Sequence, residues 1–189
     1  KQPHDAGRRR LAMSALAMGA GIGLGAVPAL AATGRPAARL AADDRFGIED
    51  LFARYAWCYD CSSEDDYLSN FTDDAIVIGI GPGQTYHGKE GIRSWYRYLL
   101  GLRAAEDDDW LHDAYHHQCF GDRRACLVYS YATHYNSNTA AKRLGVRSAG
   151  YFVSECVSQG GIWLFHRHSV NRWDRAALPW KKPLPWAAA

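Results

Sequence analysis

The sequence lacks an excess of charge of either sign. Its 189 residues include 22 Lys and Arg against 20 Asp and Glu. Without the first 31 residues, the chain loses Lys1, Arg8, Arg9, Arg10 and Asp5, and 18 basic and 19 acidic side chains remain. Nucleic-acid-binding proteins need a basic face. The balance therefore argues against nucleic acid as a partner.

The sequence also lacks the long, strongly apolar run of a transmembrane helix, which takes ~20 residues. Its most apolar segment, up to Val27, is diluted by Gly19, Gly21, Gly23 and Gly25. Basic residues precede this segment, and small residues suited to signal peptidase follow it, namely Arg8-Arg9-Arg10 and Ala29-Leu30-Ala31.

These features predict a twin-arginine-type signal peptide over residues 1–31, cleaved after Ala31. The protein would then be exported, folded, to the periplasm or the extracellular space, with no stable membrane anchor after cleavage. An uncleaved anchor is the alternative interpretation of the same segment.

No third metal ligand accompanies the histidines at a diagnostic spacing, although the chain has 8 His and 5 Cys. His112 with His116, and His166 with His168, are pairs that can bring two imidazoles together. On a strand, His166 and His168 share a face, but a polar, exposed rim explains such a pair more often. We therefore predict no metal site.

Cys58 and Cys61 have the C-x-x-C spacing of redox sites. No thioredoxin-like strand precedes them, and on a helix end this spacing more often means two buried thiols. Five cysteines in an exported protein leave at least one unpaired, and the sequence leaves the pairing of the others open.

The remaining chain predicts one domain over residues 43–175, since a domain usually has ~100 to 200 residues. An Ala-rich linker over 32–42 precedes it, and no internal repeat is present. The tail over 176–189 is rich in proline and tryptophan, so we expect it to lie extended against the body rather than to form a helix.

Apolar periodicity predicts α-helices over 48–59 and 92–103, each with one buried face and with Arg103 as the only polar member of its stripe. Ser62 or Ser63 would cap a short helix that buries Leu68 and Phe71. β-branched and aromatic residues predict strands over 125–135, 148–158 and 162–173, with Gly160-Gly161 as the turn between the last two. This order predicts an α+β fold.

Several local motifs occur in one order between Ile48 and Leu100. Tyr59-Asp60 ends the first helix, Phe71-Thr72-Asp73-Asp74-Ala75 follows the second, and His87-Gly88-Lys89-Glu90-Gly91-Ile92 opens the third. Together they resemble the SnoaL-like family of the nuclear transport factor 2-like superfamily, and are most similar to scytalone dehydratase. The resemblance implies a cone-shaped α+β barrel, in which three N-terminal helices pack on a strongly curved antiparallel sheet around one ligand cavity.

The resemblance also implies catalytic roles for Asp60, Tyr59 and two histidines. His134, at the end of the strand from Cys126, matches the second histidine. His112 matches the first if about three residues are deleted, with His116 and His117 as alternatives. Asp60 would orient the first histidine, which removes a proton beside a carbonyl and helps a hydroxyl to leave, while Tyr59 would donate to the carbonyl.

The chain departs from the family pattern at two pocket positions. Ile80 lies near the position of a second tyrosine, and Phe152 lies near that of an asparagine. A similarity to ketosteroid isomerase in Arg54-Tyr55 and Asp73-Asp74-Ala75 places Gly79 where that enzyme has its catalytic aspartate, which argues against steroid isomerisation.

The aromatic residues of the predicted pocket favour a small apolar or aromatic ligand, although core packing explains them almost as well. Their substrate-binding members would be Tyr55, Trp57, Trp95, Tyr96 and Phe152. Three functions fit these features. The first is a cofactor-independent lyase or cyclase acting on a small hydroxylated cyclic or polyketide-like ketone. The second is a non-catalytic binding module, and the third is an interaction protein that forms a homodimer or homotrimer.

Overall fold

The structure, a computed structural model, describes residues 40–80, 84–106 and 108–187. The predicted signal peptide lies outside these residues, as does nearly all of the predicted linker. No helix in the described ranges is long and apolar enough to cross a membrane.

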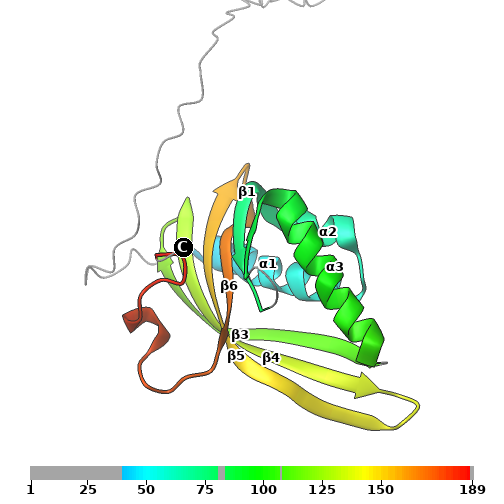
Figure 1. Cartoon of the computed structure of the whole chain (residues 1–189). Helices are drawn as coiled ribbons and strands as arrows, with labels where there is room; N and C mark the ends of the chain where they lie inside the picture. Colours follow the sequence, from blue (N-terminus) through cyan, green and yellow to red (C-terminus); the bar gives the residue numbers. More distant parts are fainter. Residues whose placement is uncertain (1–39, 81–83, 107, 188–189) are drawn as a thin grey trace, which may run out of the picture.

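Three helices lie on one side of a curved sheet (Figure 1). They are α1 (Ala42–Asp60), α2 (Glu64–Ser69) and α3 (Gly88–Glu106). The predicted apolar stripes are their buried faces, with Ile48, Leu51 and Phe52 of α1 at most 1% exposed. Ser63 is the residue that precedes α2, but its hydroxyl donates to the Asp66 carboxylate (2.6 Å) rather than accepting from the helix backbone.

The sheet has six strands in the order β2-β1-β6-β5-β4-β3. It is mixed rather than wholly antiparallel as predicted, because β1 runs parallel to β6. The chain reaches β6 from β1 only after α3 and four further strands, so no hairpin constrains this pair to be antiparallel. The strands are β1 (Phe71–Ile78), β2 (Thr85–His87), β3 (Asp109–Gly121), β4 (Ala125–Asn138), β5 (Arg143–Gln159) and β6 (Ile162–Arg172).

Hairpins join β3 to β4, β4 to β5 and β5 to β6. Gly160 and Gly161 connect β5 to β6 with φ values of 60° and 84°, a left-handed backbone that glycine adopts without strain. The β4–β5 hairpin extends beyond the helices, as Figure 1 shows in yellow. Both strands are longer than predicted, since β4 ends at Asn138 and β5 begins at Arg143.

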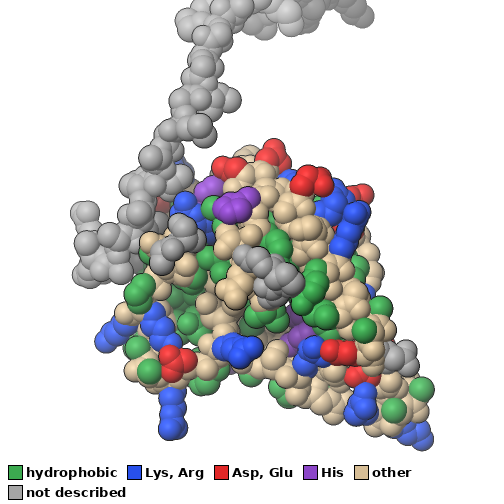
Figure 2. All heavy atoms as spheres, in the orientation of Figure 1, with side chains coloured by type: hydrophobic (Ala, Val, Ile, Leu, Met, Phe, Trp, Pro, Cys, Tyr) green, Lys and Arg blue, Asp and Glu red, His purple; other side chains and the backbone are tan. Residues whose placement is uncertain are grey.

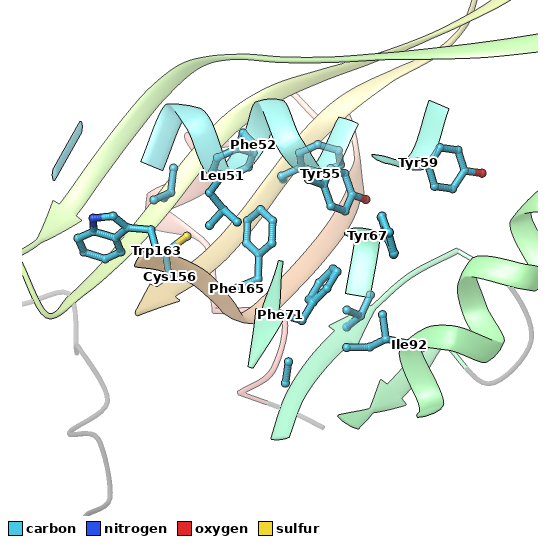
Figure 3. Packing of buried hydrophobic residues seen from close by; sticks show 14 of the residues in the cluster. Leu51, Phe52, Tyr55, Tyr59, Tyr67, Phe71, Ile92, Cys156, Trp163 and Phe165 are labelled. Atoms are coloured by element: carbon cyan, nitrogen blue, oxygen red, sulfur yellow. The ribbon is translucent and has the colours of Figure 1, made fainter. Parts of the chain in front are cut away.

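The core between the helices and the inner face of the sheet is largely aromatic (Figure 3). Tyr55 and Tyr59 lie one turn apart on α1, and Tyr55 packs against Phe71 and Phe165 with ring centroids 6.2 and 5.6 Å apart. Tyr67 of α2 lies between Tyr55 and Tyr59, at 5.2 and 5.9 Å. This packing holds the C-terminal end of α1 against the sheet.

The C-terminal tail lies against the outer face of the sheet. It contains one 3₁₀ turn, Pro179–Lys181, so it is not extended throughout. Its side chains Trp180, Leu184 and Trp186 pack on a small cluster of Leu127, Tyr129 and Val153. The tail thereby buries apolar side chains that would otherwise face solvent.

Candidate functional site

The end of α1 is held by an arginine from α3. Arg103 Nη1 donates to the carbonyl oxygens of Tyr59 (3.4 Å) and Asp60 (3.1 Å), and its Nη2 donates to the Ser62 hydroxyl. The last carbonyls of a helix have no partner within it and carry partial negative charge. A guanidinium there offsets the unfavourable position of the Asp60 carboxylate at a helix C-terminus.

Asp60 binds His112 of β3 through two hydrogen bonds. The His112 ring Nδ1 lies 2.6 Å from Asp60 Oδ1, and its backbone N–H donates to Oδ2 at 3.0 Å. Since a carboxylate can only accept, it holds the neutral ring in the tautomer that carries its proton on Nδ1. The lone pair of Nε2 is then available to take a proton. Both side chains are largely buried, at 17% exposure for His112 and 13% for Asp60.

His134 stacks on His112. The two residues are direct partners in the β3–β4 register, and their rings are 4.2 Å apart and inclined by 23°. Burial, followed by the nearby His112 and Arg147, lowers the pKa of His134 to about 3. His134 is therefore neutral at physiological pH, and its buried Nε2 has no hydrogen-bond partner among the described residues.

Tyr59 contacts His112, and Tyr96 contacts Tyr59 in turn. The Tyr59 ring is 4.6 Å from the His112 ring and 5.7 Å from that of Tyr96, both in edge-to-face geometry. Burial raises the pKa of both phenols, so each stays protonated. Within the described ranges, neither hydroxyl has a hydrogen-bond partner. Unpaired buried polar groups are costly in an apolar core, which favours a site where they meet a polar ligand.

A network of charges supports the site from the side of the projecting hairpin. Arg147 of β5 lies over the Trp110 ring, 4.3 Å from its centroid, and forms an ion pair with Glu106. Trp110 donates to the same carboxylate at 3.2 Å and packs on His134 with ring centroids 4.6 Å apart. Figure 2 shows basic and acidic side chains side by side near the end of α3. These contacts connect α3 to the hairpin and orient Trp110.

A groove of about 410 Å³ runs between α1 and β3, and His112 lies on its wall. Its rim includes Trp57, which is 71% exposed. Asp60 and His134 contact His112 but are not among the residues that line the groove, which are Glu49, Phe52, Ala53, Ala56, Trp57 and residues 112–117. Because β3 is an edge strand, the groove gives access to His112 from the edge of the sheet.

The other predicted site residues are divided between this region and the core. His116 and His117 line the groove, but the ladder shifts register between Tyr115 and Gln118, and His116 has a φ of 56°. Of the three candidate histidines, His112 is the one bonded to Asp60.

The predicted substrate-binding residues do not form one group. Tyr96 contacts Tyr59, and Trp57 lies on the groove rim. Tyr55 and Phe152 pack instead around His168, with ring centroids 5.0 and 4.8 Å from it. Trp95 stacks on Tyr86 with ring centroids 6.0 Å apart, and its ring fills the space in front of Gly79.

His166 and His168 do not share a face as predicted, and the expectation of an exposed rim is wrong for His168. A register shift between β5 and β6 pairs Cys156 with Phe165, which moves His166 out of the alternation. His168 is fully buried, its Nδ1 lies 2.9 Å from the Ser154 hydroxyl, and burial lowers its pKa to about 3. His166 Nδ1 lies instead 3.2 Å from the Thr72 hydroxyl. Over the described ranges, no three His, Cys, Asp or Glu side chains converge to hold a metal ion.

The chain matches the family model of the SnoaL-like domain over residues 41–169, more than half of its length. It belongs to the SnoaL-like family. This family includes polyketide cyclases and dehydratases. No protein with a curated description matches the chain in sequence.

Solved structures share the fold of this SnoaL-like protein at low sequence identity. A protein of unknown function with a cystatin-like fold from Nostoc punctiforme is 21% identical with a TM-score of 0.61, covering 76% of this chain and 99% of its own. Aln2 from a Streptomyces species is 15% identical with a TM-score of 0.62, covering 70% and 92%. A protein provisionally named scytalone dehydratase from Novosphingobium aromaticivorans is 17% identical with a TM-score of 0.56, covering 75% and 95%. These likenesses establish the cone-shaped fold.

Sequence reasoning missed three residues that shape the region. Arg103 was visible as the single polar member of an apolar helical stripe, which is the signal of a buried or capping cation. Arg147 does not interrupt an apolar stripe of this kind, so its sequence context did not indicate a role in the site. His168 looked like a rim residue because the register shift beside it leaves no trace in the alternation of residue types.

Proposed function

We propose that this SnoaL-like protein is a cofactor-independent lyase that eliminates water from a small hydroxylated cyclic or polyketide-like ketone. The observation that supports this most directly is the double hydrogen bond from His112 to the Asp60 carboxylate. It fixes one tautomer of the imidazole of a residue that lines an open groove. Fixed orientation and an accessible lone pair are what a general base requires.

In this proposal, Nε2 of His112 removes a proton from the carbon next to the substrate carbonyl. The ring becomes an imidazolium, and the Asp60 carboxylate stabilises its charge across the 2.6 Å contact. The electron pair of the broken C–H bond moves toward the carbonyl oxygen and forms an enolate. The same pair then forms the new C=C bond as the β-hydroxyl leaves with a proton, as water.

The enolate oxygen needs donors that keep their own protons. The ring of Tyr59 contacts His112, and Tyr96 contacts Tyr59. Neither hydroxyl has a partner among the described residues, and their raised pKa values keep them protonated. Donors aimed at the developing charge stabilise it in the transition state. Tyr59 is the donor that contacts the base directly.

The roles of the two histidines are different. His134 has a pKa of about 3, so it carries no proton that it could release as an acid near neutral pH. We assign it a positioning role, since its ring stacks on that of His112, and assign to the His112 imidazolium the proton that leaves with the hydroxyl. One group then acts as base and afterwards as acid.

The remaining parts of the proposal concern partners and location. We propose a flat, apolar or aromatic ligand, since Trp57 and Phe52 contribute to the groove beside His112. We also propose self-association as a homodimer or homotrimer, and export by the twin-arginine route. Gel filtration with light scattering tests the first of these two, and the location of the mature protein in cells that lack the twin-arginine system tests the second.

A substrate screen tests the chemistry. Purified protein is incubated with a panel of cyclic β-hydroxy ketones, and water loss is followed by the absorbance of the conjugated product. His112→Ala should reduce turnover by ~10² or more, and Tyr59→Phe should cost less because the ring is retained. Tight binding of these ketones without turnover by the wild type would replace the lyase by the binding module.

A further inference from the structure

Cys58 and Cys61 flank Tyr59 and Asp60, and the structure changes the interpretation of this pair. Cys61 is exposed and Cys58 is half-buried, so they are not two buried thiols as the sequence favoured. Cys61 is the residue that follows α1, and its backbone N–H still donates to the Trp57 carbonyl at 2.9 Å. The backbone is therefore helical through Asp60 and leaves the helical conformation at Cys61.

Helical geometry places the two cysteines at a distance that suits a disulfide. Residues three apart on an α-helix have Cα atoms about 5 Å apart and project on the same side. Disulfides bridge Cα separations of ~4.4 to 6.8 Å. Cβ atoms three residues apart on a regular helix are ~5–6 Å apart, and a disulfide needs ~3.5 to 4.5 Å. The bond therefore forms once the turn tightens at Cys61, where φ of −85° and ψ of 2° already depart from helical values.

The surroundings of the two thiols differ. The Cys58 thiol interacts with the Asn70 side chain, and burial raises its pKa. The Cys61 thiol reaches solvent. Charged groups near Cys58 are Arg54 and Asp66, and Arg103 reaches the adjacent Ser62. The exposed thiol is accordingly the one that an oxidant meets first.

We propose that Cys58 and Cys61 form a reversible disulfide that locks the last turn of α1, the turn that carries Asp60. Its consequence for catalysis rests on the proposed function, whereas the disulfide itself does not. The residues between the two cysteines are Tyr59 and Asp60, and their carbonyls are the ones that Arg103 binds. The disulfide would close a covalent loop of four residues and limit the local unfolding of this last turn of α1.

A small-molecule disulfide such as oxidised glutathione is a sufficient oxidant. The Cys61 thiolate attacks one glutathione sulfur, which forms a mixed disulfide and releases one glutathione thiolate. Cys58 then loses its proton and attacks the Cys61 sulfur, and the second glutathione leaves. The two protein thiols lose two electrons and two protons, and one oxidised glutathione becomes two reduced molecules.

The experiment equilibrates the full chain in glutathione buffers from fully reduced to fully oxidised, traps free thiols by alkylation and maps them by mass spectrometry. We expect one two-electron transition confined to Cys58 and Cys61. The oxidised form should have a Tm about 2 to 5 °C higher and slower amide exchange at Asp60 and Cys61. Cys61→Ser, a change at an exposed position, should abolish all three effects, and the matched control Cys119→Ser should retain them.

Two results would overturn the inference. One is free Cys58 and Cys61 thiols in fully oxidised buffer, and the other is a Tm difference that persists in Cys61→Ser. Neither readout needs a substrate. A protein that forms this disulfide but turns over no ketone contradicts only the proposed function, and an active protein that forms none contradicts only the disulfide.

Discussion

Replacing Asp60 by Asn tests the central pair of the site. The carboxylate accepts the Nδ1–H and the backbone N–H of His112 at 2.6 and 3.0 Å. The amide has one acceptor oxygen and an NH₂ group that can only donate. It can therefore satisfy only one of the two N–H groups, and it lacks the charge that stabilises the imidazolium.

The size of the effect follows from the lost interaction. A hydrogen bond to a charged group is worth about 1.5 to 3 kcal/mol, and each 1.36 kcal/mol is tenfold in rate. We therefore expect Asp60→Asn to lower kcat about 10- to 100-fold with little change in KM, because the charge forms only as the proton is transferred.

Two measurements check this reasoning. Nitrogen-15 NMR of the His112 ring should show the Nδ1–H tautomer in the wild type and a shift toward the other tautomer in Asp60→Asn. In kinetics, Asp60→Asn combined with His112→Ala should be no slower than His112→Ala alone, since the aspartate acts through the histidine. Additive losses in the double variant would refute the pairing of roles, and an unchanged tautomer would refute the orienting role of Asp60.

Three further predictions concern stability and are each read from urea unfolding. Arg103→Met should cost about 1 to 2 kcal/mol because the carbonyls at the end of α1 lose their partner, whereas exposed Arg123→Met should cost almost nothing; equal costs would contradict the capping role. His168 has a pKa of about 3 in the folded protein, below ~6.5 in the unfolded chain, so the unfolded state binds more protons. The free energy of unfolding should therefore fall by about 1.4 kcal/mol per pH unit as the pH drops from about 6 to 4. His168→Phe should flatten this slope, and an unaltered slope would assign it to other groups. Gly150→Ala should be destabilising because the new Cβ would clash with the Asn171 carbonyl oxygen. Gly145→Ala on the same strand is the control, since its Cβ would meet nothing within 4 Å. Similar costs for both variants would show that the strand relaxes around the new methyl group.

The helices and the strands over 125–135, 148–158 and 162–173 could be predicted because they depend on local patterns. The stripe of Ile48, Leu51 and Phe52 recurs with the period of a helix, and Gly160-Gly161 is a turn that few other residue pairs can form. The predicted bounds differ from the observed ones by several residues, and α1 for example starts at Ala42 rather than at Ile48. The residues at which a helix begins and ends depend also on tertiary contacts, which local sequence patterns do not contain.

The sequence by itself determined which residues are candidates for the chemistry of the site. The helix end at Tyr59 and Asp60 and the strand that carries His134 follow from residue type and periodicity, which arise from steric preferences and hydrogen bonds between near neighbours. The roles proposed for these residues follow from the resemblance to the SnoaL-like family.

Only the tertiary structure decided which of these residues meet. His112 rather than His116 or His117 binds Asp60, 52 residues away in sequence, because α1 crosses the edge strand at that point and the register shift after Tyr115 moves the later histidines along the groove. A second register shift buried His168, and the parallel pairing of β1 with β6 closed the sheet over the core. Such choices depend on the sum of many distant packing contacts, in which a shift of one residue turns a side chain to the other face.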